Sequence, residues 1–170
     1  SHDMGLIGFH LNMLASGASH AIMRTELFAR RPLLWLELAS RMGATVLCSP
    51  NFGYQHYLKQ YQLKPRPQLD LSAVRLIFNG AEPISADLCR RFMQAMAGHG
   101  LRPEAMFTVY GLAEASLAVS FPRLGAPLAT LHLERAGLRV GEPVRIAESP
   151  ADPLGEFVKL GGPVPGTEIR

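Results

Sequence analysis

The stretch VRLIFNGAEPISADLCRRFMQAMA, residues 74–97, holds a predicted strand, a loop and a helix in direct succession. Residues 74–80 are mostly apolar and are interpreted as a strand of the kind that is buried on both faces of a parallel sheet. Ser85 can cap the helix that follows, and Asp87 in its first turn suits the helix dipole. The apolar residues of the helix recur every four positions, at Leu88, Phe92 and Met96. The stretch therefore predicts one β-loop-α unit of an α/β fold.

Segments of the same kind lie on both sides of this unit. In chain order we expect a strand over 19–26, a helix over 31–43, a strand over 44–50, a helix over 51–63, the strand over 74–80, a helix from 85 and a strand over 105–111. In the first of these helices, Leu34, Leu38 and Met42 recur at helical spacing and predict its buried stripe. The order βαβαβαβ predicts a mainly parallel β-sheet flanked by helices.

Beyond residue 117 the helical pattern fades. Short strand-like runs separated by Gly and Pro follow at 117–121, 128–134, 138–148 and 155–162. Such runs are typical of short antiparallel strands. We therefore expect a parallel α/β subdomain over 1–120 and a short antiparallel, β-rich segment over 121–170.

Composition excludes several classes of protein. With 170 residues, 48% of them hydrophobic and 18% charged, the chain has the composition of a globular domain. Its net charge of +3 comes from scattered basic residues, which argues against nucleic-acid binding. No apolar run reaches the roughly 18 residues of a membrane span, and no secretory signal opens the chain. Cys48 and Cys89 have no CxxC spacing and suggest reduced thiols in a cytoplasmic protein.

Four polar clusters could meet at one edge of the predicted sheet. Three of them follow strands, namely SPNFGY at 49–54, NGAEPIS at 79–85 and YGLAEAS at 110–116, and the fourth, SHDMG, opens the chain. In open α/β sheets, ligands bind outside the carboxyl ends of the strands. If the strands are parallel, this edge is the expected binding site.

The residue types in these clusters suit a nucleotide. Tyr110 offers a stacking face, and the backbone of residues 80–82 offers an opposing edge with hydrogen-bonding groups. Glu114 offers a hard oxygen ligand for Mg²⁺ carried by phosphates. Each feature also has an ordinary interpretation: a packed Tyr at a strand end, a plain strand-to-helix loop, and a Glu that answers a helix dipole. Together they favour a nucleotide whose base is sandwiched and whose phosphates bring the metal.

The ordered set HDMGLIG, PNF.Y, NGAEPI and YGLAEAS resembles the adenylate-forming (acyl-activating, AMP-binding) enzyme superfamily. The closing segment over 131–170 is similar to the fatty acyl-AMP ligase branch, and the resemblance spans nearly the whole chain. It implies part of an ATP-dependent fatty acid adenylating ligase. Such an enzyme converts a carboxylate and ATP to acyl-AMP and pyrophosphate, with Mg²⁺, and passes the acyl group to a carrier-protein thiol.

The resemblance also implies a role for each matching residue. Adenine would lie between Tyr110 and a wall formed by Gly80, Ala81, Glu82 and Pro83. The α-phosphate and acyl carbonyl would be approached by Gly111, Leu112 and Ala113. The catalytic residues would be His2, beside the substrate carboxylate, and Glu114, the Mg²⁺ ligand. The substrate side would be lined by Asn51, Phe52, Tyr54 and Asn79. A solvated His2, and core packing of Phe52 and Tyr54, remain alternatives.

The family's phosphate loop, ribose-binding Asp motif and catalytic Lys have no counterpart here, since Lys59, Lys64 and Lys159 lie in unlike contexts. Both ends of the chain are abrupt. We therefore expect an internal fragment of the large N-terminal domain of such an enzyme, inactive by itself. One alternative is a fragment of an acyl-CoA synthetase, with free CoA as acceptor. Another is a non-catalytic interaction domain that forms a homodimer.

Overall fold

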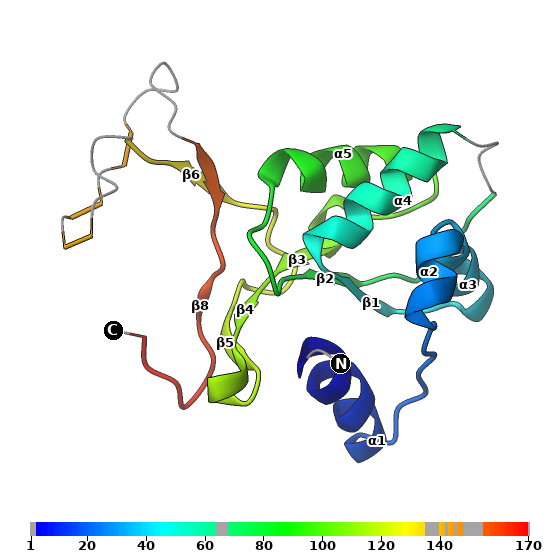
Figure 1. Ribbon diagram of the computed structural model, residues 1–170, viewed down its shortest axis with the longest axis horizontal. Coiled ribbons are helices and arrows are strands. Elements are labelled where there is room, and N and C mark those ends of the chain that lie inside the picture. Colours follow the sequence, from blue (N-terminus) through cyan, green and yellow to red (C-terminus); the bar gives the residue numbers. More distant parts are fainter. Residues whose placement is uncertain are drawn as a thin grey trace.

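The computed structural model describes residues 3–63, 68–134, 140–141, 143–144, 146–147 and 155–169, and it confirms the α/β class (Figure 1). In chain order the elements are the π-helix η1 (Met4–Leu11), α1 (Asn12–Ala15), α2 (Thr25–Arg30), α3 (Leu34–Met42), β1 (Val46–Ser49), α4 (Asn51–Leu63), β2 (Leu76–Asn79), α5 (Ala86–Ala97), the 3₁₀ helix η2 (Pro103–Ala105), β3 (Met106–Thr108), β4 (Tyr110–Gly111), the 3₁₀ helix η3 (Ala113–Ala115), β5 (Ala118–Phe121), β6 (Thr130–His132), β7 (Glu156–Val158) and β8 (Gly162–Pro163). No helix in the described part of the chain has the length and apolar character to cross a membrane.

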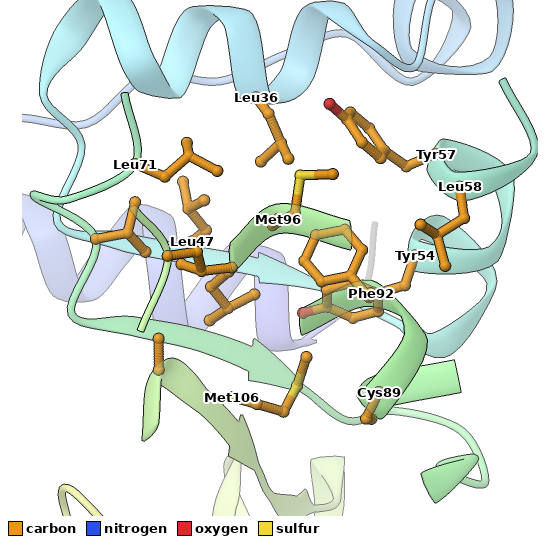
Figure 2. Packing of buried hydrophobic residues seen from close by; sticks show 14 of the residues in the cluster. Leu36, Leu47, Tyr54, Tyr57, Leu58, Leu71, Cys89, Phe92, Met96 and Met106 are labelled. Atoms are coloured by element: carbon orange, nitrogen blue, oxygen red, sulfur yellow. The ribbon is translucent and has the colours of Figure 1, made fainter. Parts of the chain in front are cut away.

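The central sheet is parallel, as predicted. Its strand order is β1-β2-β3, with Val46 opposite Leu76 and Ile77 opposite Met106. Helices α4 and α5 lie on one side of it, and the N-terminal helix lies on the other (Figure 1). The main core fills the space between the sheet and helices α3, α4 and α5 (Figure 2).

The structure confirms the cap and the buried face predicted for helix α5. The Ser85 hydroxyl accepts a hydrogen bond from the Leu88 N–H at 3.2 Å, which satisfies one of the free N–H groups of the first turn. Leu88, Phe92 and Met96 are all buried against the sheet. One strip of side chains, repeated every fourth residue, thus fixes the helix on the core.

Two sequence predictions in the N-terminal third are wrong. Residues 19–26 belong to no strand of the described structure: the chain is irregular there, and α2 begins at Thr25. The side chain of Ile22 is 71% exposed, so the segment buries too little apolar surface to form a sheet strand. In α3 the buried residues are Leu36 and Ala39, whereas Met42 is 61% exposed. A helix this rich in leucine has more than one apolar stripe, so spacing alone did not choose the buried face.

The antiparallel, β-rich section is also confirmed. β5 pairs with β4 and β8, and β6 pairs with β7, all antiparallel. The predicted strand over 138–148 lies mostly outside the described residues, although Ile146 forms an isolated bridge with Leu133. The subdomain boundary at residue 120 stays a prediction.

An ion pair ties the β6–β7 hairpin to helix α5. Both guanidinium Nη atoms of Arg90 donate to the carboxylate of Glu156, with an Nη1–Oε2 distance of 2.7 Å. Hydrogen bonding from Arg90 is the largest cause, and a hydrogen bond from Thr130 the second, that lowers the pKa of Glu156 from its ordinary value to about 2. Sixty-six residues separate the two partners, so their contact closes a long loop.

We expect the stability of the chain to depend on Glu156 in acid. Because its pKa is lowered in the folded state, the carboxylate stabilises the fold above its unfolded pKa near 4.5, and this contribution is lost between about pH 4.5 and 2. The free energy of unfolding measured by urea titration across this window should fall less steeply for Glu156→Gln than for the wild type. Asp87→Asn, which removes the exposed partner of Arg91 one turn along α5, is the control. Parallel curves for wild type and Glu156→Gln would contradict the expectation.

Candidate active site

Three of the predicted site loops follow β1, β2 and β3. Because these strands are parallel neighbours, their carboxyl ends share one edge of the sheet. The Val109 N–H donates to the Asn79 carbonyl at 2.9 Å, which extends the β2–β3 pairing into the loops. Gly80 is buried against Val109, the residue that precedes Tyr110. The second and third loops therefore touch where the sequence predicts the two sides of an adenine pocket.

The second loop has an unusual backbone. A Cβ on Gly80 would lie 2.9 Å from Val109 Cγ2 and 3.0 Å from its carbonyl oxygen, so a side chain there would push the two loops apart. Ala81 has a φ of 72°, in the left-handed region that costs a non-glycine residue about 1 kcal/mol or more. Residues held in this region gather at ligand sites, where the surrounding structure enforces them. The loop is thus a fixed shape and not a loose connection.

Two hydrogen bonds clamp the second loop to the first. The carboxylate Oε1 of Glu82 accepts from the Phe52 N–H at 2.6 Å, and Asn51 Oδ1 accepts from the Ser85 N–H at 3.2 Å. The negative charge of Glu82 lies at the N-terminus of α4, where the helix dipole favours it. Both side chains were predicted to contact ligands, and in the structure they hold two loops in register. The sequence offered a faint signal for the clamp, since an Asn opens α4 and a Glu precedes a proline.

We expect Asn51 and Glu82 to act as one unit. Removal of either side chain leaves an unpaired N–H at a helix start and should cost about 1 kcal/mol of stability. A urea-unfolding double-mutant cycle with Asn51→Ala and Glu82→Ala should give a double-variant loss smaller than the sum of the single losses, because either change frees the same loop. Asn12→Ala, which removes an exposed amide that bonds to Ser16 and not to Asn51 or Glu82, provides the control. Strict additivity would show that the two bonds act separately.

The third loop forms the tip of the β4–β5 hairpin. Tyr110 presents its ring with 46% of the residue exposed. Gly111 lies so close to the next strand that a Cβ would be 2.1 Å from the Leu117 carbonyl oxygen, and the same oxygen accepts the Leu112 N–H at 2.9 Å. Glu114 is exposed in the short 3₁₀ turn at the tip. The predicted stacking ring in β4 and the predicted metal ligand in η3 therefore lie on one hairpin.

The N-terminal segment lies against the same turn. In η1, a Cβ on Gly8 would lie 2.9 Å from Leu117 Cδ2, and the Phe9 ring meets Phe78 of β2 edge-on with a centroid distance of 5.4 Å. The HDMGLIG segment is thus placed beside the YGLAEAS loop. His2 itself lies outside the described residues.

Two predicted substrate residues lie beneath the loops. Tyr54 is completely buried, packs on Phe92 and donates its hydroxyl to the Phe78 carbonyl at 2.5 Å. The side chain of Asn79 is also completely buried and donates to Cys89 Sγ at 3.3 Å. Both side chains are therefore buried, and their contact with substrate stays a prediction. Phe52, by contrast, is 55% exposed and stacks on His56.

The metal prediction rests on a single carboxylate. Within the described residues, no group of three or more His, Cys, Asp or Glu side chains could hold a metal ion. Mg²⁺ is commonly bound by one or two carboxylates together with substrate phosphates. Exposed Glu114 fits that pattern, in which the nucleotide supplies the remaining ligands.

Comparison with known proteins is consistent with this geometry. The family model described as AMP-binding enzyme matches residues 1–170. The medium-chain fatty acid–acyl-carrier-protein ligase JamA of Moorena producens is 33% identical over 169 residues, which cover 99% of this chain and 28% of the relative. The long-chain fatty acid–AMP ligase FadD32 of Mycolicibacterium smegmatis is 40% identical over 157 residues, 88% of this chain and 24% of the relative.

A solved structure is also similar to this chain. The fatty acyl-adenylate ligase of L. pneumophila, in complex with acyl adenylate and pyrophosphate, superimposes with a TM-score of 0.85 and 36% identity. The match covers 95% of this chain and 28% of that protein. The chain thus spans about a quarter of the length of the relatives that it matches.

Proposed function

The chain belongs to the AMP-binding enzyme family, and on that premise we propose that it supplies the adenine- and acyl-binding part of an ATP-dependent fatty acid adenylating ligase. The reaction joins a fatty acid carboxylate to the α-phosphate of ATP and releases pyrophosphate. The relatives named as fatty acid ligases support this choice of substrate. The 170 residues by themselves are proposed to be inactive.

The observation that carries the proposal is the meeting of three loops at one sheet edge. The clamp through Asn51 and Glu82 fixes the first two loops, and the contact of Gly80 with Val109 fixes the third. An exposed aromatic ring, Tyr110, follows that contact directly. A strained loop and an exposed ring at the carboxyl edge of a parallel sheet suit a flat base better than a protein partner.

In the proposed mechanism the chain mainly positions the reactants. The Tyr110 ring stacks on adenine, opposite the backbone of residues 80–83, and Asn51 and Glu82 keep that wall in place. The turn over 111–113 approaches the α-phosphate and the acyl carbonyl, and His2 lies beside the carboxylate. Glu114 would hold Mg²⁺, which neutralises phosphate charge when bound. Such reactions depend on positioning and charge neutralisation more than on covalent help from the protein.

The acceptor is proposed to be a carrier-protein thiol, with free CoA as the alternative, and the location is proposed to be the cytoplasm. Cys48 and Cys89 are free thiols. Burial raises the pKa of Cys48 to about 12, which disfavours the reactive thiolate.

A segment exchange tests the proposal. In JamA of Moorena producens, the matching segment is replaced by this chain, and ATP–pyrophosphate exchange is measured with fatty acids and Mg²⁺. We expect fatty acid-dependent exchange, with Tyr110→Ala raising the KM for ATP roughly tenfold or more through lost stacking. The isolated chain should give no exchange. A well-folded chimera without exchange would contradict the proposal, and self-association of the isolated chain in sedimentation would then favour the interaction-domain alternative. Comparison of free CoA with a carrier protein as acceptor of the active chimera separates the two ligase classes.

A further inference from the structure

Two histidines outside the proposed active site face each other on the N-terminal segment. His10 lies in the last turn of η1, and His20 lies in the irregular stretch between α1 and α2. His10 Nδ1 and His20 Nε2 are 3.0 Å apart, and the ring centroids are 5.1 Å apart at an interplanar angle of 67°. His20 is exposed and His10 is half-buried. Solvent can therefore reach the pair.

The distance between the two nitrogens is also that of a bidentate metal chelate. If each metal–nitrogen bond is about 2.05 Å long, a nitrogen separation of 3.0 Å gives an angle of about 94° at the metal. An angle near 90° belongs to square-planar or tetragonal coordination, which Cu²⁺ and Ni²⁺ prefer. Imidazole suits both Cu²⁺ and Ni²⁺, and affinity rises toward Cu²⁺.

We propose that His10 and His20 form a two-imidazole site for Cu²⁺, and more weakly for Ni²⁺, with water in the remaining positions. In the metal-free pair the facing nitrogens share one hydrogen. On binding, that hydrogen moves to the outer nitrogen of the same ring by way of solvent, and each ring turns by roughly 40° so that its facing nitrogen points at the metal and no longer at the other nitrogen. The bound metal would close the loop from residue 10 to residue 20.

The proposal does not depend on the ligase activity. Among the described residues no third His, Cys, Asp or Glu completes the group, so the affinity should be moderate and should depend on both rings together. Two of the other described histidines have partners of a different kind: His56 Nε2 contacts the Ala29 carbonyl oxygen, and His99 Nε2 contacts the Tyr61 hydroxyl. They provide matched controls on the same chain.

The test is calorimetric titration of the 170-residue chain with Cu²⁺ and Ni²⁺. The chain carries no polyhistidine tag and has His2→Ala, so that a histidine beside the terminal amine does not contribute. We expect one equivalent of Cu²⁺ to bind, His10→Gln and His20→Gln each to weaken it at least tenfold through loss of the chelate, and the double variant to bind no more weakly than either single one. His56→Ala and His99→Ala should bind like the wild type. Electron paramagnetic resonance of the Cu²⁺ form should show two coupled imidazole nitrogens.

Equal affinity of the wild type and His20→Gln would overturn the proposal, as would a Cu²⁺ spectrum with a single imidazole. Because His20 is exposed, its replacement should leave the fold intact, and far-ultraviolet circular dichroism of each variant checks this directly.

Discussion

Replacement of Gly111 by alanine is expected to destabilise the chain by about 3 kcal/mol and to disorganise the turn that carries Tyr110 and Glu114. The new Cβ would lie 2.1 Å from the Leu117 carbonyl oxygen, a distance that no rotation of a side chain can relieve. The β4–β5 pair must separate, which removes the Leu112–Leu117 hydrogen bond at 2.9 Å. Urea unfolding measures the loss in free energy of unfolding, and the Leu112 amide should exchange its hydrogen faster than in the wild type.

The matched control is Gly162→Ala. Gly162 lies in β8 of the same small sheet, and an added Cβ there would meet no atom within 4 Å. This variant should stay within about 0.5 kcal/mol of the wild type. Equal stability of the two variants would mean that Gly111 does not hold the hairpin closed.

Phe92→Ala is expected to cost 3–5 kcal/mol, roughly what large-to-small changes in a well-packed core cost. Phe92 is completely buried beside Tyr54 and Tyr57 (Figure 2), and its ring contacts both of theirs and that of Trp35. Since Tyr54 also bonds to the Phe78 carbonyl directly beneath the loops, the cavity should loosen the sheet edge as well as the core. The free energy of unfolding from urea titration measures the loss.

Phe157→Ala removes the same side chain from β7, where the residue is 42% exposed, and should cost less than 1.5 kcal/mol, roughly the transfer free energy of the buried part. If Phe92→Ala were no more destabilising than Phe157→Ala, the cluster around α3, α4 and α5 would not be the main core.

The sequence predicted best the elements whose local signals agree with one another. α5 has a capping serine and a regular apolar strip, and α4 begins and ends where the pattern placed it, over Asn51–Leu63. Apolar content alone was not enough to predict a strand or the buried face of a helix. Residues 19–26 contain enough apolar side chains for a strand, but no strand in the described part of the chain pairs with them. The buried face of α3 depends on what packs against it.

The candidate site was predictable as a location and less so as a set of roles. Parallel strands bring their following loops to one edge, and the motifs identified those loops. Burial, however, depends on tertiary packing. For this reason the sequence could not show that Tyr54 and Asn79 are buried whereas Tyr110 is exposed. It also could not show the hydrogen bonds that Asn51 and Glu82 form with residues 30 or more positions away.

The central claim is that the loops over 79–85 and 110–116 bind adenylate together. The most direct measurement is nuclear magnetic resonance titration of the chain with a non-hydrolysable fatty acyl-adenylate analogue. The amides of residues 80–82 and 110–113 should shift along one binding curve, those at the C-terminal end of α5 should not move, and Tyr110→Ala should weaken binding roughly tenfold or more. Shifts confined to other surfaces, or an unchanged affinity of Tyr110→Ala, would contradict the claim.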